Sequence, residues 1–329
     1  MKTLQFGIIG LGHFGKHYAR LLQENPDVQL VAVANKSGDV FKKSAIHLPE
    51  NVKISLDADE IINDVCIDCV VIATPPSTHA QVIVKALRAG KHVFVEKPMV
   101  ISVAETHAIK KELKKNKKLV FMVGFQYVYN DYIRYLKNHI KELGIVKYVL
   151  GENLYCGPFR ADVGSFMDAA IHDCAILEYL FSPGKVKSVA GARRSIGKTN
   201  NDDFGAVSVT FQSGLMVHLL TSWYWPEKVR KITLVGDSGM VLFNDRDEHK
   251  LKSFQHKYPV WDKKQSSLFL PGAADQPVIA SVVAQEPLKN ELDHFIECVN
   301  MGKTPLTGFD FGYKVTKMME QISGRMKKL

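Results

Sequence analysis

The sequence predicts an α/β protein: a Rossmann-type domain with a doubly wound parallel sheet, followed by an α+β domain on a mainly antiparallel open sheet. Two observations predict this order. Up to about residue 123, short apolar runs alternate with amphipathic stretches of helical length, which is typical of parallel strands joined by right-handed crossovers. Beyond residue 123, several β-like runs follow one another with only turns between them. We therefore expect domains over residues 1–123 and 124–329.

The elements of the first domain follow from this alternation. The expected strands are 4–9, 29–34, 52–54, 68–73, 92–95 and 119–123, and the expected helices are 14–24, 57–63, 78–89 and 102–116. The last helix opens on Ser102 with Glu105 three residues later, which is a capping-box pattern.

The second domain is expected to hold both helices and strands. The expected helices are 130–142, 165–181, 287–301 and one from about 310, and the expected strands are 146–156, 186–194, 205–212, 214–223, 229–236 and 239–244. A Gly-Asp-Ser-Gly turn over 236–239 indicates a hairpin. Residues 246–285 show no clear period, so we expect them to be irregular.

Composition narrows the functional classes. The chain has 329 residues, 46% of them hydrophobic and 23% charged, and no apolar run reaches the roughly 20 residues that span a bilayer. With no secretory pattern at the N-terminus, we expect a cytoplasmic protein without a membrane partner. The net charge of +9 includes six lysines between 110 and 118, which we interpret as the solvated face and end of one helix. No nucleic-acid-binding pattern accompanies this charge, so we expect no nucleic-acid partner.

Cysteine usage predicts no metal site. The chain has five cysteines, and Cys66 and Cys69 show the C-x2-C spacing without a second pair or a nearby histidine. We interpret both as buried thiols at the entry to an apolar strand.

A glycine-rich turn follows the first expected strand. Gly10-Leu11-Gly12-His13-Phe14-Gly15 is G-x-G-x-x-G and opens a helix, which is the context in which this motif binds a dinucleotide. Its glycines allow a tight turn, approach to a pyrophosphate and close helix packing, while the helix N-terminus stabilises the phosphate charge. We expect NAD or NADP as the cofactor.

The end of the second strand should select between the two cofactors. An NAD site usually carries an acidic residue there, which bonds the ribose 2′-hydroxyl and repels a 2′-phosphate. This chain has Asn35-Lys36-Ser37 instead. Asn35 can still hydrogen-bond, and Lys36 either pairs with a phosphate or points into solvent. The pattern leans slightly towards NADP.

Two further stretches resemble the Gfo/Idh/MocA oxidoreductase family. They are residues 68–79, which include Thr74-Pro75 and His79, and residues 90–98, which end in Glu96-Lys97-Pro98. The resemblance covers essentially the full length of the chain. It implies that Thr74, Pro75 and His79 lie along the dinucleotide, and that Glu96 and Lys97 lie by the nicotinamide and its ribose, with Lys97 also reaching the substrate.

The family's D-x-x-x-H signature is matched by Asp168 and His172. The resemblance makes the histidine the general acid/base. The chemistry agrees, because residues four apart project from one face of a helix, and an imidazole titrates near neutrality. Asp168 can then orient the ring. Asp173 points elsewhere on the helix and is expected to be structural.

The prediction of the substrate class rests on three stretches of sequence: the expected helix 166–177 and residues 222–230 and 286–295. These are most similar to family members associated with nucleotide-sugar and surface-polysaccharide biosynthesis. We expect hydride transfer at a secondary hydroxyl of a sugar, most of all a nucleotide sugar of the UDP-N-acetylhexosamine type. Lys97, His172 and Asp168 are the expected catalytic residues, and Tyr127 and Arg160 are further expected substrate contacts.

Two alternatives stay open. One is a free polyol, inositol or monosaccharide dehydrogenase. The other is a non-catalytic NAD(P)-binding regulator on the same fold, against which the presence of both Lys97 and His172 argues. The exposed face of the second sheet is a natural dimer surface, so we expect a homo-oligomer, dimer or tetramer.

Overall fold

The chain forms two compact units in the computed structural model, which describes residues 3–39, 48–157, 159–160, 162–197, 201–255, 260–262, 267–269 and 277–329. The first unit comprises Met1–Gln126 and Glu286–Lys317, and the second comprises Tyr127–Gln285 and Met318–Leu329. The sequence division at residue 123 had assigned everything after it to the second domain. The structure corrects this for residues 286–317, which belong to the first unit. The helix Pro287–Met301 in this segment contributes to the core of that unit.

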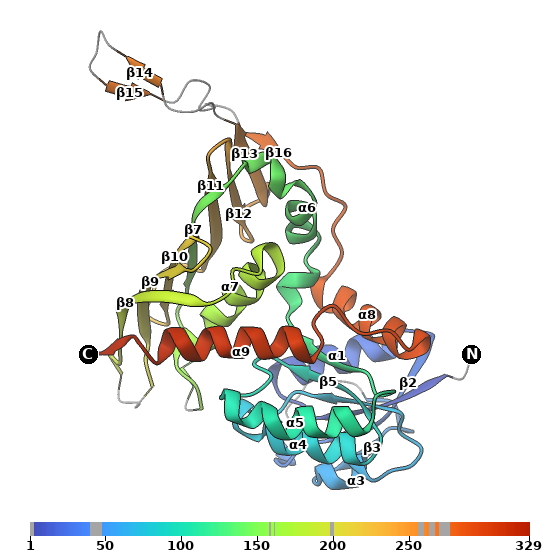
Figure 1. Cartoon of the computed structure of the whole chain (residues 1–329). Coiled ribbons are helices and arrows are strands. Elements are labelled where there is room, and N and C mark those ends of the chain that lie inside the picture. The colour runs from blue at the N-terminus through green and yellow to red at the C-terminus, as the bar shows by residue number, and fades with distance from the viewer. Residues whose placement is uncertain are drawn as a thin grey trace. The chain divides into compact units, whose positions relative to one another are not determined.

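The first unit is built on a parallel sheet, as the sequence predicted (Figure 1). In the described part of the chain it has six strands in the order β3-β2-β1-β4-β5-β6, which is the doubly wound order of dinucleotide-binding folds. The strands are β1 (Leu4–Ile9), β2 (Val28–Ala34), β3 (Lys53–Ser55), β4 (Cys69–Ile72), β5 (His92–Glu96) and β6 (Phe121–Gly124). All four residues of β4 are buried, as expected of a central strand covered on both faces.

Helices connect these strands. They are α1 (His13–Glu24), α3 (Ala58–Ile62), α4 (Pro76–Arg88) and α5 (Val103–Lys115), and α4 packs against α5. The capping box predicted at α5 is present: Glu105 Oε2 accepts a hydrogen bond from the Ser102 backbone N–H at 2.9 Å. The six lysines between 110 and 118 are all exposed, which confirms that they form the solvated face and end of α5.

Helix α8 (Pro287–Met301) completes the apolar core of the first unit. The Phe295 ring is fully buried, and its centroid lies 6.2 Å from that of Phe6 on β1 and 5.6 Å from that of Phe94 on β5. Tyr18 on α1 extends this group, with its ring 5.1 Å from Phe94. A segment distant in sequence therefore packs on the first two-fifths of the chain. Helix α9 (Phe309–Ser323) follows and begins in the first unit.

The second unit contains a large mixed sheet, mostly antiparallel as predicted. Its described strands run in the order β16-β13-β12-β11-β7-β10-β9-β8-β17, with parallel pairing at β7/β10 and β8/β17. The strands are β7 (Val146–Leu154), β8 (Val186–Arg194), β9 (Phe204–Phe211), β10 (Met216–Ser222), β11 (Val229–Gly236), β12 (Gly239–Asn244), β13 (Leu251–Gln255), β16 (Val278–Ile279) and β17 (Lys327–Lys328).

Helix α7 (Ser165–Phe181) packs on β7, β9 and β10 in the middle of this sheet. Thirteen of its side chains are buried, so it is the central helix of the second unit rather than an amphipathic surface helix. The other helices are η1 (Gln126–Tyr129), α6 (Asp131–His139) and η2 (Ile140–Leu143), and the last two divide the single helix expected over 130–142.

Two further sequence expectations were wrong. Residues 246–285 are not wholly irregular: they contain β13, β16 and a separate pair, β14 (Val260–Asp262) with β15 (Ser267–Phe269), while Pro259 and Pro271 lie outside the described residues. These strands are short, and their pairing is not visible in a local apolar period. Cys69 is buried as predicted, but Cys66 is exposed because it precedes β4 in a surface turn. Among the described residues, no helix has both the length and the apolar character needed to cross a membrane.

Candidate active site

The glycine turn between β1 and α1 is shaped by close backbone contacts. Gly10 has φ +96°, and a Cβ there would lie 2.6 Å from the Ala73 carbonyl oxygen. A Cβ on Gly15 would lie 1.9 Å from the Gly10 carbonyl oxygen. Neither position accommodates a side chain, so β1, α1 and β4 can meet at this turn only with glycine.

Gly12 differs from its neighbours because space is open around it. None of the described atoms lies within 4 Å of where its Cβ would stand. It is the N-cap of α1, with no side-chain hydrogen bond to the cap in the described structure and no acidic residue in the first turn. A helix N-terminus of this kind binds anions through its backbone N–H groups and dipole. The turn therefore fits a dinucleotide pyrophosphate.

Asn35 ties the end of β2 to the glycine turn. Its Oδ1 accepts a hydrogen bond from Leu11 N at 2.9 Å, and its Nδ2 donates to the Ser37 carbonyl oxygen at 2.8 Å. Both polar groups of the amide thus have partners within the protein. Lys36 and Ser37 are exposed beside it. Sequence reasoning had considered Asn35 only as a ribose contact and missed that it fixes the turn.

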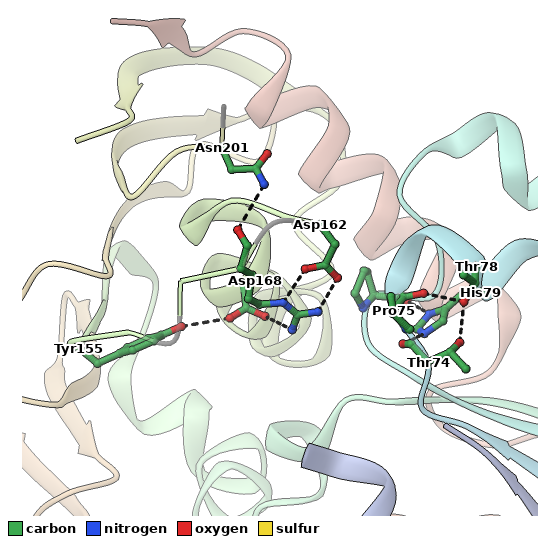
Figure 2. Close-up of polar contacts among 10 residues, drawn as sticks. Thr74, Pro75, Thr78, His79, Tyr155, Asp162, Asp168 and Asn201 are labelled. Carbon is green, nitrogen blue, oxygen red and sulfur yellow. Dashed lines mark hydrogen bonds and ion pairs between the residues drawn. The ribbon is translucent and has the colours of Figure 1, made fainter. Parts of the chain in front are cut away.

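His79 lies inside the first unit, at the start of α4 (Figure 2). Its side chain is fully buried, with Nε2 2.8 Å from the Thr74 carbonyl oxygen and Nδ1 2.8 Å from the Pro98 carbonyl oxygen. Thr78 Oγ1 lies 2.7 Å from Thr74 Oγ1 and 2.8 Å from the Pro75 carbonyl oxygen. The ring therefore links the loop after β4 to the segment after β5. Contact of His79, Thr74 and Pro75 with the dinucleotide stays a prediction.

Glu96 and Lys97 stand at the carboxyl end of β5. Glu96 is buried and its Oε2 accepts a hydrogen bond from Lys97 N at 3.0 Å, while Lys97 is half-buried before a cis peptide bond to Pro98. The glycine turn, Thr74 and Lys97 follow β1, β4 and β5, which are neighbours in the parallel sheet. Ligands of doubly wound folds bind at this edge of the sheet.

In the second unit, α7 carries Asp168 and His172 one helical turn apart. His172 is buried, with 5% of its surface exposed, and the side chain of Asp168 is 15% exposed. The carboxylate of Asp168 is fixed on two sides (Figure 2): Oδ2 accepts from the Tyr155 hydroxyl at 3.2 Å, and Oδ1 lies 3.3 Å from a guanidinium nitrogen of Arg160. Tyr155 in turn accepts from Trp223 Nε1 at 3.0 Å.

Arg160 is shared between two carboxylates. Beyond Asp168, it forms a bidentate pair with Asp162, at 2.9 Å from Nε and 2.7 Å from Nη2. The three residues together carry one negative charge. The pKa of Asp162 is lowered, first by its hydrogen bond with Arg160.

Tyr127 lies edge-on to His172, with ring centroids 5.2 Å apart. Its hydroxyl donates to Asp245 Oδ2 at 3.0 Å and accepts from Arg230 Nη1 at 2.6 Å. Burial raises the pKa of Tyr127 well above its usual value, so the phenol stays protonated near neutral pH. Burial also raises the pKa of Tyr155, to about 12. Neither tyrosine is therefore suited to be the base.

Asp173, next to His172, points into the core. Its Oδ2 accepts a hydrogen bond from Asn153 Nδ2 at 2.6 Å. Burial raises its pKa to about 7, although the charge of Arg230 and the Asn153 hydrogen bond both lower it. Sequence reasoning expected Asp173 to be structural but missed Asn153 and Arg230 as its surroundings. The one available signal was that Asn153 is a polar residue on an inward-facing position of its strand.

Comparison with known proteins decides the family. Residues 4–125 match the oxidoreductase family with an NAD-binding Rossmann fold, Gfo/Idh/MocA, and residues 152–242 match the C-terminal domain of that family. The chain belongs to the Gfo/Idh/MocA family. It is a nicotinamide-dependent oxidoreductase, and this confirms the resemblance noted in the sequence.

Three similar proteins illustrate the relationship. A scyllo-inositol 2-dehydrogenase (NAD(+)) from Bacillus subtilis is 29% identical over 91% of this chain and 87% of its own. An uncharacterised oxidoreductase from Streptococcus pneumoniae is 31% identical over 80% of this chain and 75% of its own. The structure of UDP-N-acetylglucosamine 3-dehydrogenase from Acidithiobacillus ferrooxidans has a TM-score of 0.81 at 19% identity, covering 99% of this chain and 98% of its own.

Replacing Asp173 by asparagine should make stability less dependent on pH. The folded pKa of about 7 exceeds the unfolded value of about 3.9. The stability contributed by the protonated form is therefore fully present below about pH 4 and is lost as pH rises to about 7. Relative to wild type, the unfolding free energy of Asp173→Asn should rise by up to about 1.4 kcal/mol per pH unit across this window.

Urea unfolding at several pH values between about 4 and 8 measures this. The control is Asp27→Asn, which alters an exposed aspartate and should show no such trend. A difference between Asp173→Asn and wild type that does not change with pH would show that Asp173 is ionised throughout.

Proposed function

We propose that the chain catalyses reversible hydride transfer between a nicotinamide cofactor and a secondary hydroxyl of a sugar or polyol, with His172 as the general acid/base. The supporting observation is the setting of His172: it is buried on α7, one turn from a fixed carboxylate and edge-on to a tyrosine that stays protonated. In that setting the imidazole is the group able to exchange a proton near neutral pH.

In this proposal the residues of the first unit bind successive parts of the dinucleotide. The turn Gly10–Gly15, with His13 and Phe14, holds the pyrophosphate, while Asn35, Lys36 and Ser37 lie at the adenosine ribose. Thr74, Pro75 and His79 line the dinucleotide, and Glu96 and Lys97 bind the nicotinamide end. When bound, the nicotinamide ring accepts the hydride that leaves the carbinol carbon.

The remaining roles concern the proton and the reacting oxygen. His172 removes the hydroxyl proton, and Lys97 donates a hydrogen bond that stabilises negative charge developing on that oxygen. Asp168, fixed by Tyr155 and Arg160, orients His172 and binds a neighbouring hydroxyl of the substrate. Tyr127 keeps its proton and contacts the sugar ring edge-on to His172.

For the substrate, we propose a free polyol or monosaccharide. A diphosphate would require uncommitted cations, and three arginines of the second unit that could bind it already have partners within the protein. Arg160 is shared by two carboxylates, Arg193 lies 3.7 Å from Asp202, and Arg230 hydrogen-bonds Tyr127. The net negative charge around Arg160 disfavours an anionic group there. The name of the Bacillus subtilis relative, an inositol dehydrogenase, supports the same choice.

A nucleotide-linked sugar is the second candidate. It is favoured by the likeness of the 222–230 stretch to nucleotide-sugar enzymes and by two exposed cations, Arg194 and Lys228. An arginine fork suits a phosphate because it binds bidentately.

We propose further that the chain self-associates through the open face of its second sheet. Tyr148 on β7 and Met216 on β10 are register partners and are 41% and 44% exposed. Exposed apolar side chains that adjoin one another are typical of an interface. Light scattering of the purified protein tests this, and a monomer at all concentrations would refute it.

For the cofactor, NADP(H) should bind no more than about tenfold more weakly than NAD(H), a difference of about 1.4 kcal/mol. The reason is that Asn35 carries no charge to repel a 2′-phosphate, while Lys36 is exposed beside it. Fluorescence titration with both reduced cofactors measures the ratio. Lys36→Ala should weaken NADPH selectively, and Lys118→Ala, an exposed lysine after α5, is the control. An NADH preference above about a hundredfold would exclude a phosphate pocket at residues 36 and 37.

His172→Ala should lower kcat by about 10²–10⁴, as expected for loss of a general base, with cofactor affinity nearly unchanged. His249→Ala removes an exposed histidine of the same unit and should leave kcat unchanged. Steady-state kinetics and cofactor titration of both variants make the comparison. If His172→Ala turned over substrate at the wild-type rate, another group would have to be the general acid/base.

The substrate class is tested by a panel of free inositols, glucose and galactose against UDP- and dTDP-sugars, following NAD(P)H absorbance. A free polyol or sugar should have the higher kcat/KM by at least about a hundredfold, or about 2.7 kcal/mol. Arg194→Glu and Lys228→Glu should then change kcat/KM by less than about twofold, as should the surface control Lys187→Glu. A nucleotide sugar that is preferred and also sensitive to reversal at Arg194 or Lys228 would establish the second candidate instead.

A further inference from the structure

Two buried carboxyl groups of the first unit share one tyrosine hydroxyl. Tyr18 Oη on α1 lies 2.5 Å from Glu96 Oε1 on β5 and 2.8 Å from Glu291 Oε1 on α8. Tyr18 and Glu291 are fully buried, and Glu96 is 6% exposed. The three residues come from three separate elements and meet beneath the carboxyl end of β5. The proposed function gives Glu96 a role but none to Tyr18 or Glu291.

Counting hydrogens shows that this cluster holds an extra proton. A phenol has one O–H, so Tyr18 can donate to only one of its two carboxyl neighbours. The other contact is a hydrogen bond only if that carboxyl group donates, which requires it to be protonated. Two ionised carboxylates on one buried oxygen would instead repel each other.

The surroundings of the two carboxyl groups decide which one keeps the proton. Glu96 Oε2 accepts a hydrogen bond from Lys97 N, which stabilises its anionic form. Glu291 Oε2 is buried and has no hydrogen-bond partner among the described residues, so nothing there stabilises a charge. The consistent direction is that Glu291 donates to Tyr18, Tyr18 donates to Glu96, and Glu96 remains the anion.

Among the described residues, no cation contributes to the electrostatic environment of Glu291 or Tyr18. The Phe94 and Phe295 rings pack beside Tyr18 and beside each other. Several charged groups of α1 and α8 pair at the surface instead: Arg20 with Glu24 and Glu286, Lys289 with Asp293, and Glu297 with Lys303. Burial, followed by the nearby Glu96 charge, raises the pKa of Glu291 well above its usual value. Burial and both carboxyl groups raise the pKa of Tyr18.

We propose that Glu291 is a positioning residue, a protonated carboxylic acid that acts through Tyr18 to hold Glu96 in place as the anion and so fix the Glu96–Lys97 segment. The importance of that segment for the nicotinamide end rests on the proposed function. The protonation of Glu291 does not depend on it.

A pH dependence follows. The protonated form of Glu291 stabilises the cluster, and this contribution is lost as pH rises through its raised pKa. Ionisation of Glu291 would place a second carboxylate charge next to the buried Tyr18 hydroxyl. Repulsion between the two carboxylates would then displace Glu96. Cofactor affinity should therefore fall at alkaline pH. The group whose ionisation causes this fall is Glu291, which lies farther from the cofactor site than Glu96.

The variant Glu291→Gln tests whether Glu291 acts through its proton or only by filling space in the core. The amide keeps an N–H for Tyr18 Oη but cannot ionise. Wild-type affinity for reduced cofactor should fall at least about tenfold as pH rises from neutral into the alkaline range, while Glu291→Gln should lose less than about threefold. Glu286→Gln, an exposed glutamate at the start of the same helix, is the matched control and should follow wild type.

Infrared spectroscopy gives a readout that needs neither cofactor nor substrate. With ¹³C-labelled glutamate, wild type at neutral pH should show the carbonyl band of a protonated glutamic acid. Glu286→Gln should keep this band and Glu291→Gln should lose it. In a Tyr18→Phe background, Glu291→Gln should no longer alter the pH profile of binding.

Either of two results overturns the proposal: absence of the protonated-acid band from wild type, or an alkaline loss of affinity in Glu291→Gln equal to that of wild type. The first is measured on the unmodified chain, so it stands even if a variant fails to fold. Failure of the His172 or substrate assignments would leave both readouts unchanged, and the two proposals can thus be distinguished.

Discussion

Burial of ionisable side chains is the constraint on which the arrangement of both units depends. A carboxyl group removed from water needs hydrogen-bond donors or a proton, because isolated charge in a protein interior is strongly unfavourable. In the second unit, Tyr155 and Arg160 supply donors to Asp168, and Asn153 supplies one to Asp173. In the first, Tyr18 and the Lys97 backbone serve Glu96. The carboxyl groups closest to the expected chemistry are therefore held in place by hydrogen bonds.

Much of the fold was predictable because its signals are local. Strand β1, helix α7 and strands β8, β11 and β12 begin and end where the periodicity of the sequence placed them. The glycine turn was predictable because its three glycines form a short local motif: Gly10 and Gly15 stand where the backbone leaves no room for a side chain, and Gly12 leaves open space at the helix N-terminus. By contrast, β13 and β16 are short strands whose pairing depends on neighbours in space, and the apolar period of residues 246–285 does not reveal them.

The site was predictable in its main residues but not in their partners. Lys97, Asp168 and His172 stand in recognisable motifs, whereas the groups that fix them are distant in sequence. Tyr127 and Arg230 are 103 residues apart, and Tyr18 and Glu291 are 273 apart. Asn35 shows the same limit at short range: its residue type suggested a ligand contact, yet its amide is used to hold the turn. Local patterns carry no information on such pairings.

The return of α8 to the first unit has a consequence for how this chain folds during synthesis. The aromatic core of Phe6 and Phe94 is completed by Phe295, so the glycine turn and its sheet emerge from the ribosome long before their last packing partner. Contacts of such large sequence separation slow folding and leave apolar surface exposed meanwhile. The nascent N-terminal segment therefore has to wait, incompletely packed, for nearly the whole chain to be made. Until then, Glu96 and Tyr18 also lack the third member of their cluster.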